Sequence, residues 1–323
     1  MIGDIYVVAE HFRGKLADVT FELLGKGREL ADAKGGRLVA VLLGNGVKHL
    51  AAQMGTARTV AVVEHPQLEN FNPETYALAL AEVVKAGTPS LTLLANSSMG
   101  MDLAASLSIR ANLPLVAYAV DVRAENDSFL VTSQLYGGKL DVESELKGQA
   151  GIVSMLAGSS PAEKGRAAAG PPQVEDFPAP SAIDSPKVRF RRLIEPEAGD
   201  VDITAQEILV SVGRGIQSAD NIPLVQALAD AMGGVLAASR PIVDSKWLPK
   251  ARQVGKSGVT VKPRFYLAVG ISGAPEHIEG MKDADLIVAI NSDPNAPIFD
   301  YAHYGVAGDL FDIVPVLTGK LKG

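Results

Sequence analysis

The alternation of short apolar runs with segments of helical periodicity is the feature that most constrains the fold of this chain. In residues 4–154 the apolar runs have the length and the β-branched content of strands that are buried on both faces. Between them, apolar residues recur at three- and four-residue spacing, as in amphipathic helices. The pattern predicts βαβ units around a parallel sheet. The predicted strands lie at 5–9, 37–43, 59–64, 90–95 and 115–122, the predicted helices at 19–33, 75–86 and 101–111, and a predicted antiparallel hairpin turns at Gly137 and Gly138.

The C-terminal part of the chain repeats this alternation and predicts a second α/β domain. One strand-like run ends at Gly213-Arg214-Gly215, another ends at Ser239-Arg240-Pro241, and runs at 265–271 and 286–290 end in small polar residues. Ligands of open parallel sheets bind at the carboxyl ends of the strands. Glycines there allow close approach of the backbone, and helix N-termini favour anions. These loops predict a ligand crevice, although ordinary strand-to-helix turns have the same composition.

Residues 158–186 separate the two domains. They are rich in Ala, Gly, Pro and Ser, a composition that predicts an extended linker. We therefore expect an N-terminal α/β domain at 1–190, which ends in this linker, and a second domain at 191–323. A further strand is predicted at 187–195. In the first domain, the loop at 94–102 is of a kind that holds phosphate at a helix N-terminus, but capping by Ser or Asn without a ligand is the preferred interpretation.

The composition excludes several classes of function. The chain has no cysteine, so it has no disulfide, thiolate nucleophile or Cys-ligated iron–sulfur centre, and redox chemistry requires a bound cofactor. A net charge of -7 argues against nucleic acid as a main partner. His11, His49 and His65 are isolated in the sequence, so no metal site is expected. No apolar run is long enough to span a membrane and the first strand begins almost at once, so we expect a cytoplasmic protein without direct membrane insertion.

Six short blocks follow one another in the C-terminal part. They are GRG at 213–215, SRPIVDSKW at 239–247, QVGKSG at 253–258, GISGAPEH at 270–277, AINSDPNAPIF at 289–299 and YGVAGDLF at 304–311. In this order they resemble the C-terminal signature of the electron transfer flavoprotein alpha subunit family, and the N-terminal part resembles the same family more weakly. The resemblance implies an N-terminal domain of nucleotide-binding type. It also implies a C-terminal Rossmann-like domain that binds one FAD within residues 205–323.

The resemblance also implies which residues contact the FAD. Arg240 would lie against the flavin ring and favour its anionic forms, His277 would donate toward the C2 carbonyl, and Ser257 would reach N5 through its hydroxyl. Asn291 and Asp309 would hold the adenosine end. The implied contacts are Arg214, Ser239, Arg240, Val254, Gly255, Lys256, Ser257, Ser272, Gly273, Ala274, Pro275, Glu276, His277, Asn291, Asp309 and Leu310.

A few positions depart from the family pattern. Lys256 and Ser257 stand where the family has the Gln and Thr of QVGQTG, and Glu276 stands where it has a Gln. Val212 replaces the first glycine of GGRG, and Lys246 replaces the glycine of DAGW. Serine keeps the hydroxyl of threonine. Lys256 and Glu276 change the local charge, which suggests a compensating pair, and they bear on the reduction potential rather than on binding.

The resemblance implies an electron carrier. The chain would be an obligate partner of a beta subunit, would accept electrons from flavin dehydrogenases, and would pass them to a quinone reductase or another acceptor. It would contribute no catalytic acid, base or nucleophile of its own. Two alternatives stay open at this point. One is an electron-bifurcating, NADH-oxidising complex with a second FAD on the beta subunit, and the other is a dinucleotide-binding module without redox work.

Overall fold

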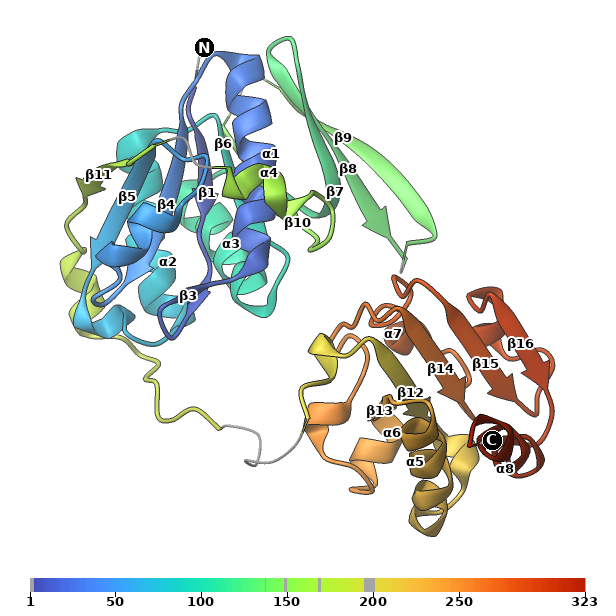
Figure 1. Ribbon diagram of the computed structural model, residues 1–323. Helices are drawn as coiled ribbons and strands as arrows, with labels where there is room; N and C mark the ends of the chain where they lie inside the picture. The colour runs from blue at the N-terminus through green and yellow to red at the C-terminus, as the bar shows by residue number, and fades with distance from the viewer. Residues whose placement is uncertain (1–2, 137, 148–149, 168–169, 195–200, 323) are drawn as a thin grey trace. The chain divides into compact units, whose positions relative to one another are not determined.

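The computed structural model describes residues 3–136, 138–147, 150–167, 170–194 and 201–322 (Figure 1). The chain divides into two compact units, Met1–Arg192 and Leu193–Gly323, whereas the sequence suggested a division after residue 190. Within the described part of the chain, no helix combines the length and the apolar character that crossing a membrane requires.

Unit 1, residues 1–192, is built on one large sheet. Among the described residues the sheet has nine strands in the order β11-β5-β4-β1-β6-β10-β7-β8-β9. The strands from β11 to β7 pair in parallel, and β8 and β9 extend the sheet in antiparallel fashion, which confirms the predicted βαβ pattern and hairpin. The strands are β1 (Ile5–Val8), β4 (Leu38–Gly44), β5 (Thr59–Glu64), β6 (Leu91–Ala95), β7 (Leu115–Glu125), β8 (Ser128–Leu135), β9 (Leu140–Lys147), β10 (Gly151–Met155) and β11 (Gln173–Asp176), with a separate short pair, β2 (His11–Phe12) and β3 (Lys15–Leu16).

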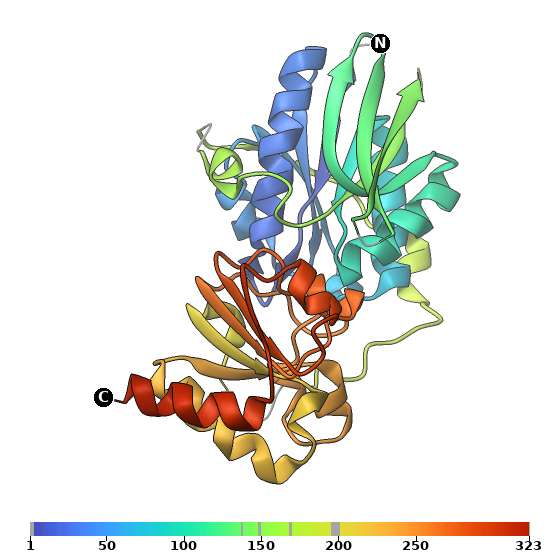
Figure 2. The ribbon, with the colours of Figure 1, turned by 90° about the vertical axis from the view of Figure 1, so that its right-hand side faces the viewer.

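The helices of unit 1 cover both faces of this sheet. α1 (Asp18–Lys34) packs its leucines into the core on one face, and α2 (Pro73–Gly87) and α3 (Ser98–Ala111) pack into the core on the other (Figure 2). α2 begins where the sequence favours a helix start. The Asn72 side chain accepts hydrogen bonds from two backbone N–H groups, and Pro73 is the first helical residue.

The segment from 158 to 186 is not the extended linker that its composition predicted. It forms α4 (Ala162–Arg166), which packs on α1, and then the edge strand β11. Further along, Ile183 is completely buried against the α2 side of the core. The prediction was wrong because pairing at the open edge of β5 needs only four residues with extended backbone, and the surrounding prolines and glycines do not prevent it.

The prediction of a strand at 187–195 was also wrong. Residues 187–194 form no strand, and Glu195 lies outside the described residues. The backbone N–H groups of Lys187 and Val188 donate to Glu74 Oε2 of α2, at 2.7 and 3.1 Å. These donors are therefore bonded to a helix side chain rather than to a neighbouring strand.

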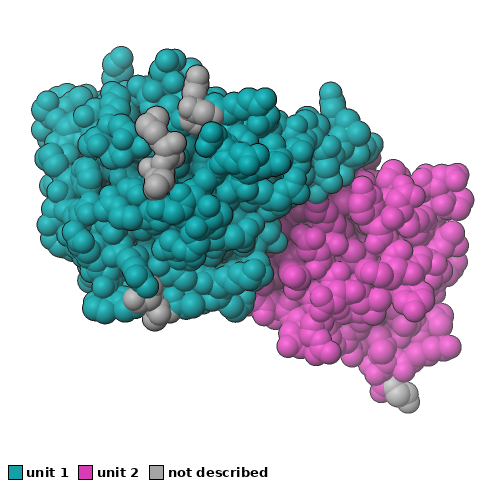
Figure 3. Space-filling model, turned by 90° about the horizontal axis from the view of Figure 1, so that it is seen from above, with its two compact units in different colours: residues 1–192 teal, residues 193–323 magenta. Residues whose placement is uncertain are grey.

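Unit 2, residues 193–323, is a doubly wound α/β domain (magenta in Figure 3). Its described residues form one five-stranded, fully parallel sheet in the order β13-β12-β14-β15-β16. The chain passes from β12 to β13 on one side and then returns to β14 on the other side of β12. This reversal makes the β12/β14 boundary the switch point at which such sheets bind ligands. The strands are β12 (Ile208–Val212), β13 (Val235–Ala238), β14 (Phe265–Val269), β15 (Ile287–Asn291) and β16 (Tyr304–Ala307).

Helices cover both faces of this second sheet as well. α5 (Ile222–Ala231), α6 (Arg240–Asp244) and α8 (Leu310–Leu321) contribute to the core on one face, where α5 and α8 contact each other. The short α7 (Pro275–Ile278) packs on the other face with the loops around Val254 and Ile298. The predicted combination of two α/β domains is therefore confirmed.

Candidate functional site

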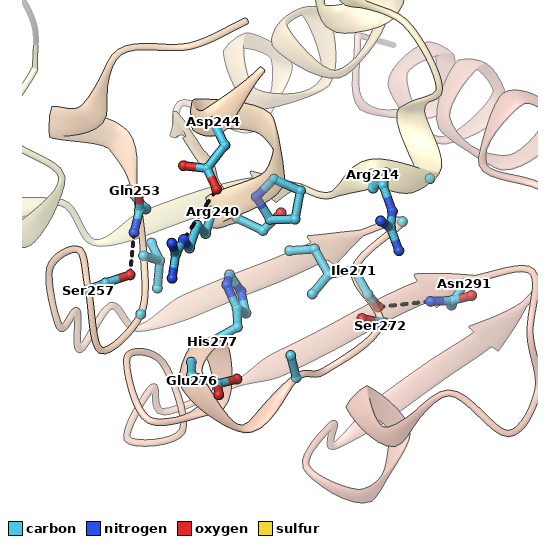
Figure 4. Close-up of a pocket in the computed structure, with 17 residues that line it drawn as sticks. Arg214, Arg240, Asp244, Gln253, Ser257, Ile271, Ser272, Glu276, His277 and Asn291 are labelled. Carbon is cyan, nitrogen blue, oxygen red and sulfur yellow. Dashed lines mark hydrogen bonds and ion pairs between the residues drawn. The ribbon is translucent and has the colours of Figure 1, made fainter. Parts of the chain in front are cut away.

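A cavity of about 610 Å³ lies at the carboxyl ends of four neighbouring strands of unit 2 (Figure 4). Its walls come from the loops that follow β12, β13, β14 and β15, and from the segment around Val254. Most of the predicted contact residues therefore come together in one place. Those that line the cavity are Arg214, Ser239, Arg240, Val254, Gly255, Ser257, Ser272, Ala274, Glu276, His277 and Asn291.

Backbone packed against backbone forms one wall of the cavity. The N–H of Gly213 donates to Val269 O at 2.8 Å, and the N–H of Gly215 donates to Gly270 O at 3.0 Å, so the loops after β12 and β14 are joined directly. Gly270 has a φ of 63°, in the left-handed region. A Cβ on Gly270 would lie 2.9 Å from Gly215 Cα. The glycines of these blocks are therefore required by the contact between the two loops.

The segment that contains Ser257 is held by its own polar groups. The N–H of Lys256 donates to Glu276 O at 2.7 Å, which ties this segment to α7. The buried Gln253 donates through Nε2 to Ser257 Oγ at 2.9 Å. Because the Ser257 oxygen accepts this bond, its own O–H is free to donate to a ligand. The predicted donation from this hydroxyl to the flavin stays a prediction, and the structure adds Gln253 as the residue that orients the hydroxyl.

Two guanidinium groups give the cavity its charge. Arg240 Nε lies 3.2 Å from Asp244 Oδ2 one turn along α6, and both side chains are largely exposed. Figure 4 shows the Arg240 guanidinium between Asp244 and the His277 ring. Arg214 follows β12 and has no ion-pair partner among the described residues. The cavity therefore offers one neutralised and one unneutralised cation to an anionic ligand.

His277 is the most buried titratable side chain of the cavity wall. The residue is 6% exposed, and Nε2 lies 2.8 Å from the hydroxyl of Tyr266 on β14. Burial lowers the pKa of His277 to about 4, an effect that the nearby Val254 carbonyl only partly opposes. Nδ1 is buried and makes no hydrogen bond to any described residue, so the Val254 carbonyl is not in hydrogen-bonding geometry with it. His277 is therefore neutral at pH 7, and it acts on a ligand as a dipole rather than as a cation.

Asn291 joins two of the ligand loops. Its Nδ2 donates to Ile271 O at 2.8 Å, and its Oδ1 accepts from Asp293 N at 2.9 Å. The side chain lines the cavity and at the same time fixes the loop after β14 to the loop after β15. Its predicted contact with the adenosine end stays a prediction.

The remaining predicted residues do not line the cavity. Asp309 accepts a hydrogen bond from Phe311 N and caps α8, and Leu310 is buried in the core against Gly270. The ammonium group of Lys256 lies 3.6 Å from Oε2 of Glu279, the residue directly after α7, whereas the sequence suggested Glu276 as its acidic partner. The predicted residues that do not line the cavity are Lys256, Gly273, Pro275, Asp309 and Leu310.

Several cavity residues were missed although they lie inside the six blocks. Asp244 could have been found because it stands four residues after Arg240 in a segment of helical spacing. Gln253 had no signal beyond its place at the start of QVGKSG. The missed residues are Gly215, Pro241, Asp244, Gln253, Gly270 and Ile271.

The loop at 94–102 of unit 1 is occupied by the protein's own groups. Ser97 Oγ accepts a hydrogen bond from Gly100 N at 2.9 Å and thereby caps α3. Ser97 Oγ also donates to Glu10 Oε1 at 2.5 Å. Burial raises the pKa of Glu10, and hydrogen bonds from Ser97 and Gly100 oppose the shift. A side-chain carboxyl therefore lies where a phosphate would bind, in agreement with the capping interpretation.

The fold and the cavity of unit 2 define a class of protein that holds a dinucleotide-like ligand across the switch point of a doubly wound sheet. Comparisons with known proteins narrow this class. Residues 5–182 match the Electron transfer flavoprotein domain, and residues 202–282 match the Electron transfer flavoprotein FAD-binding domain.

Relatives match over nearly the whole chain. The Electron transfer flavoprotein subunit alpha of Thermoanaerobacterium thermosaccharolyticum is 36% identical, over 99% of this chain and 98% of that protein. The Acryloyl-CoA reductase electron transfer subunit beta of Anaerotignum propionicum is 35% identical, over 99% and 95%. Protein FixB of Clostridium saccharobutylicum is 34% identical, over 98% and 96%. The chain belongs to the electron transfer flavoprotein alpha subunit family, its role is in electron transfer, and its cofactor is FAD.

The residues of the cavity fit an FAD. A flavin dinucleotide carries pyrophosphate charge and ring carbonyls, so its site needs cations and donors. The unneutralised Arg214, the free O–H of Ser257 and the unpartnered Nδ1 of His277 supply groups of these kinds. The buried Nδ1 is the most specific of these observations, because a buried polar atom normally has a partner.

Proposed function

We propose that this chain is the FAD-carrying alpha subunit of a heterodimeric electron transfer flavoprotein. It accepts electrons from flavin dehydrogenases and passes them to a quinone reductase or another acceptor. Bound FAD supplies the redox chemistry, because a flavin takes up and releases electrons reversibly. The cavity at the carboxyl ends of four strands carries the proposal, since it combines two guanidinium groups with hydrogen-bond donors in one crevice.

In this proposal the chain's own residues hold the FAD and set its charge preference. Arg214 offers an unneutralised cation to the pyrophosphate, Ser257 donates to the ring, and His277 offers a neutral donor next to it. The chain contributes no acid, base or nucleophile to the reaction. A beta subunit is the proposed partner, because the relatives at 36% and 35% identity are named as subunits of electron-transfer proteins.

Co-expression with a beta subunit, followed by counting of the released flavin, tests this function. We expect a yellow heterodimer that holds its FAD on this chain, whereas the chain expressed alone should be poorly soluble or lose its flavin. Two FAD molecules per heterodimer would instead favour an electron-bifurcating complex. A colourless protein that binds only pyridine nucleotide would favour a dinucleotide-binding module. A stable monomer that keeps stoichiometric FAD through gel filtration would contradict the proposed need for a partner.

The ion pair on α6 gives a second prediction, in which two substitutions act in opposite directions. Arg240→Gln removes a positive charge from the cavity and should lower the flavin's reduction potential, because negative charge on the reduced ring loses a favourable neighbour. Asp244→Asn leaves Arg240 unneutralised and should raise it. Both side chains are more than 60% exposed, so each effect should stay at about 1 kcal/mol or less after solvent screening.

Redox titration of the heterodimer measures both shifts. The double variant Arg240→Gln/Asp244→Asn should fall close to the wild type, because it removes the pair together. Arg264→Gln serves as the control, since Arg264 pairs with Glu207 and does not line the cavity. Shifts of the same sign for Arg240→Gln and Asp244→Asn would show that the pair does not act on the flavin through its charge.

A further inference from the structure

Tyr266 lies in the core of unit 2, directly beneath the cavity. It is fully buried on β14, and its hydroxyl lies 2.8 Å from His277 Nε2. Among the described residues, this imidazole nitrogen is the one hydrogen-bond partner of the hydroxyl. Figure 4 shows the His277 ring pointing into the cavity, so the phenol contacts a cavity residue from the core side.

The direction of the proton in this bond follows from the partners available. Burial raises the pKa of Tyr266, so the phenol keeps its proton at neutral pH. A buried O–H without an acceptor is strongly unfavourable, and among the described residues the only acceptor in hydrogen-bonding geometry is Nε2. Ser211 on β12 is close enough to oppose the pKa shift of Tyr266, but its hydroxyl is not in hydrogen-bonding geometry with any described residue. As a donor to the phenol oxygen, it would be compatible with the same direction. The phenol therefore donates to Nε2.

A neutral imidazole carries one proton, so accepting a bond at one nitrogen places the proton on the other. In His277 that other nitrogen is Nδ1, which is buried and makes no hydrogen bond to the part of the chain that the structure describes. Four charged groups line the same cavity, but in the described structure none of them makes a hydrogen bond to the ring, so they do not change this assignment. They are Arg214, Arg240, Asp244 and Glu276.

We propose that Tyr266 is a positioning residue, whose hydroxyl holds the proton of neutral His277 on Nδ1 and so makes this side chain a hydrogen-bond donor toward the ligand in the cavity. The inference rests on the proposed function where the ligand is concerned. A donor suits a carbonyl oxygen, and it suits that oxygen better still when reduction of the ring makes it more negative. In the opposite tautomer the imidazole would present a lone pair to the same oxygen and would repel it.

Nitrogen-15 NMR of histidine-labelled heterodimer tests the assignment, because long-range couplings show which ring nitrogen carries the proton. The spectra are recorded with FAD bound and after FAD removal, and His277→Gln identifies the His277 signals. The wild type should show the proton on Nδ1 in both forms. Tyr266→Phe should shift the tautomer ratio toward Nε2–H by about tenfold, the effect of losing one buried hydrogen bond. It should also weaken binding of reduced FAD more than binding of oxidised FAD.

Tyr76→Phe is the matched control. Tyr76 is also buried, and its hydroxyl donates to Leu68 O at 2.9 Å in unit 1, so the same atom is removed away from the cavity. This variant should leave the His277 tautomer unchanged. A wild-type proton on Nε2 would overturn the proposal even if Tyr266→Phe failed to fold, and so would an unchanged tautomer in Tyr266→Phe. If the wild type bound no FAD but showed Nδ1–H, the proposed function would fail while the positioning role of Tyr266 stood.

Discussion

Gly273→Ala is expected to destabilise unit 2 by about 2 to 5 kcal/mol and to abolish stable FAD binding. Gly273 has a φ of 88°, which an alanine adopts only with strain. A Cβ at this position would also lie 2.3 Å from Ile298 N, within a contact made only of backbone. The hydrogen bond from Ile298 N to Ser272 O, at 3.0 Å, would have to break or shift, and with it the ligand loop after β14.

Gly233→Ala separates backbone strain from steric overlap. Gly233 also has a positive φ, of 65°, but nothing lies within 4 Å of its missing Cβ. Its substitution should therefore show the strain alone, about 1 to 2 kcal/mol, and leave FAD binding intact. Denaturant unfolding of the heterodimer and flavin counting measure both effects. Equal losses of unfolding free energy in the two variants would mean that the backbone around Gly273 moves apart easily to accept a Cβ. The ligand loop after β14 would then be less rigid than the structure indicates.

A second large effect is expected from pH, and it arises from His277. Its pKa is lowered from an ordinary 6.5 to about 4, mainly by burial. In the unfolded chain the imidazole takes up a proton as the pH falls below 6.5, whereas in the folded protein it stays neutral until about pH 4. The stability from neutral, buried His277 is therefore fully present above pH 6.5 and is lost as the pH falls to 4. The loss should amount to about 3 kcal/mol.

His277→Gln removes this titration and keeps a neutral side chain. Between pH 6.5 and pH 4, its free energy of unfolding should fall by about 3 kcal/mol less than that of the wild type, whatever its stability at pH 7. His303→Gln is the control, because it removes another imidazole of unit 2, one that accepts a hydrogen bond from Ile287 N, but retains His277. The loss of stability that His277 causes between pH 6.5 and pH 4 should persist in this variant. Parallel slopes for wild type and His277→Gln would show that the imidazole takes up its proton over the same pH range in the folded and the unfolded chain, so that burial does not lower its pKa.

The regular parts of the fold could be predicted because their signal is local. A buried parallel strand such as β4 is a continuous apolar run, and α1 shows its amphipathic spacing within a single segment. β11 gave no such signal. Its four residues are polar or half-buried, and they form a strand only because β5 offers an open edge that lies far away in the sequence. Edge pairing is a tertiary event, and composition does not report it.

In the site, too, features with a local sequence signal could be predicted, and features that depend on tertiary contacts could not. Glycine-rich loops at strand ends indicated where the cavity lies, and the family resemblance named most of its lining. The contact between Tyr266 and His277 was not predictable, since a tyrosine within an apolar run is normally a core residue. Asp309 has a role that the sequence analysis did not name, because it caps α8 by accepting a hydrogen bond from Phe311 N, and its expected contact with the ligand stays a prediction.

Two groups of residues around the cavity differ in how well they tolerate substitution: the glycines of its backbone wall and the exposed charged side chains at its rim. At Gly213, Gly270 and Gly273 any side chain would collide with backbone, so mutation there is removed by selection for folding. Arg240, Asp244 and Glu276 are exposed, and their replacement leaves the packing intact. A lineage can therefore adjust the driving force of electron transfer at the rim, one charge at a time, while the architecture that retains the cofactor stays fixed. Retention of the cofactor and adjustment of its reduction potential therefore depend on different residues of this chain.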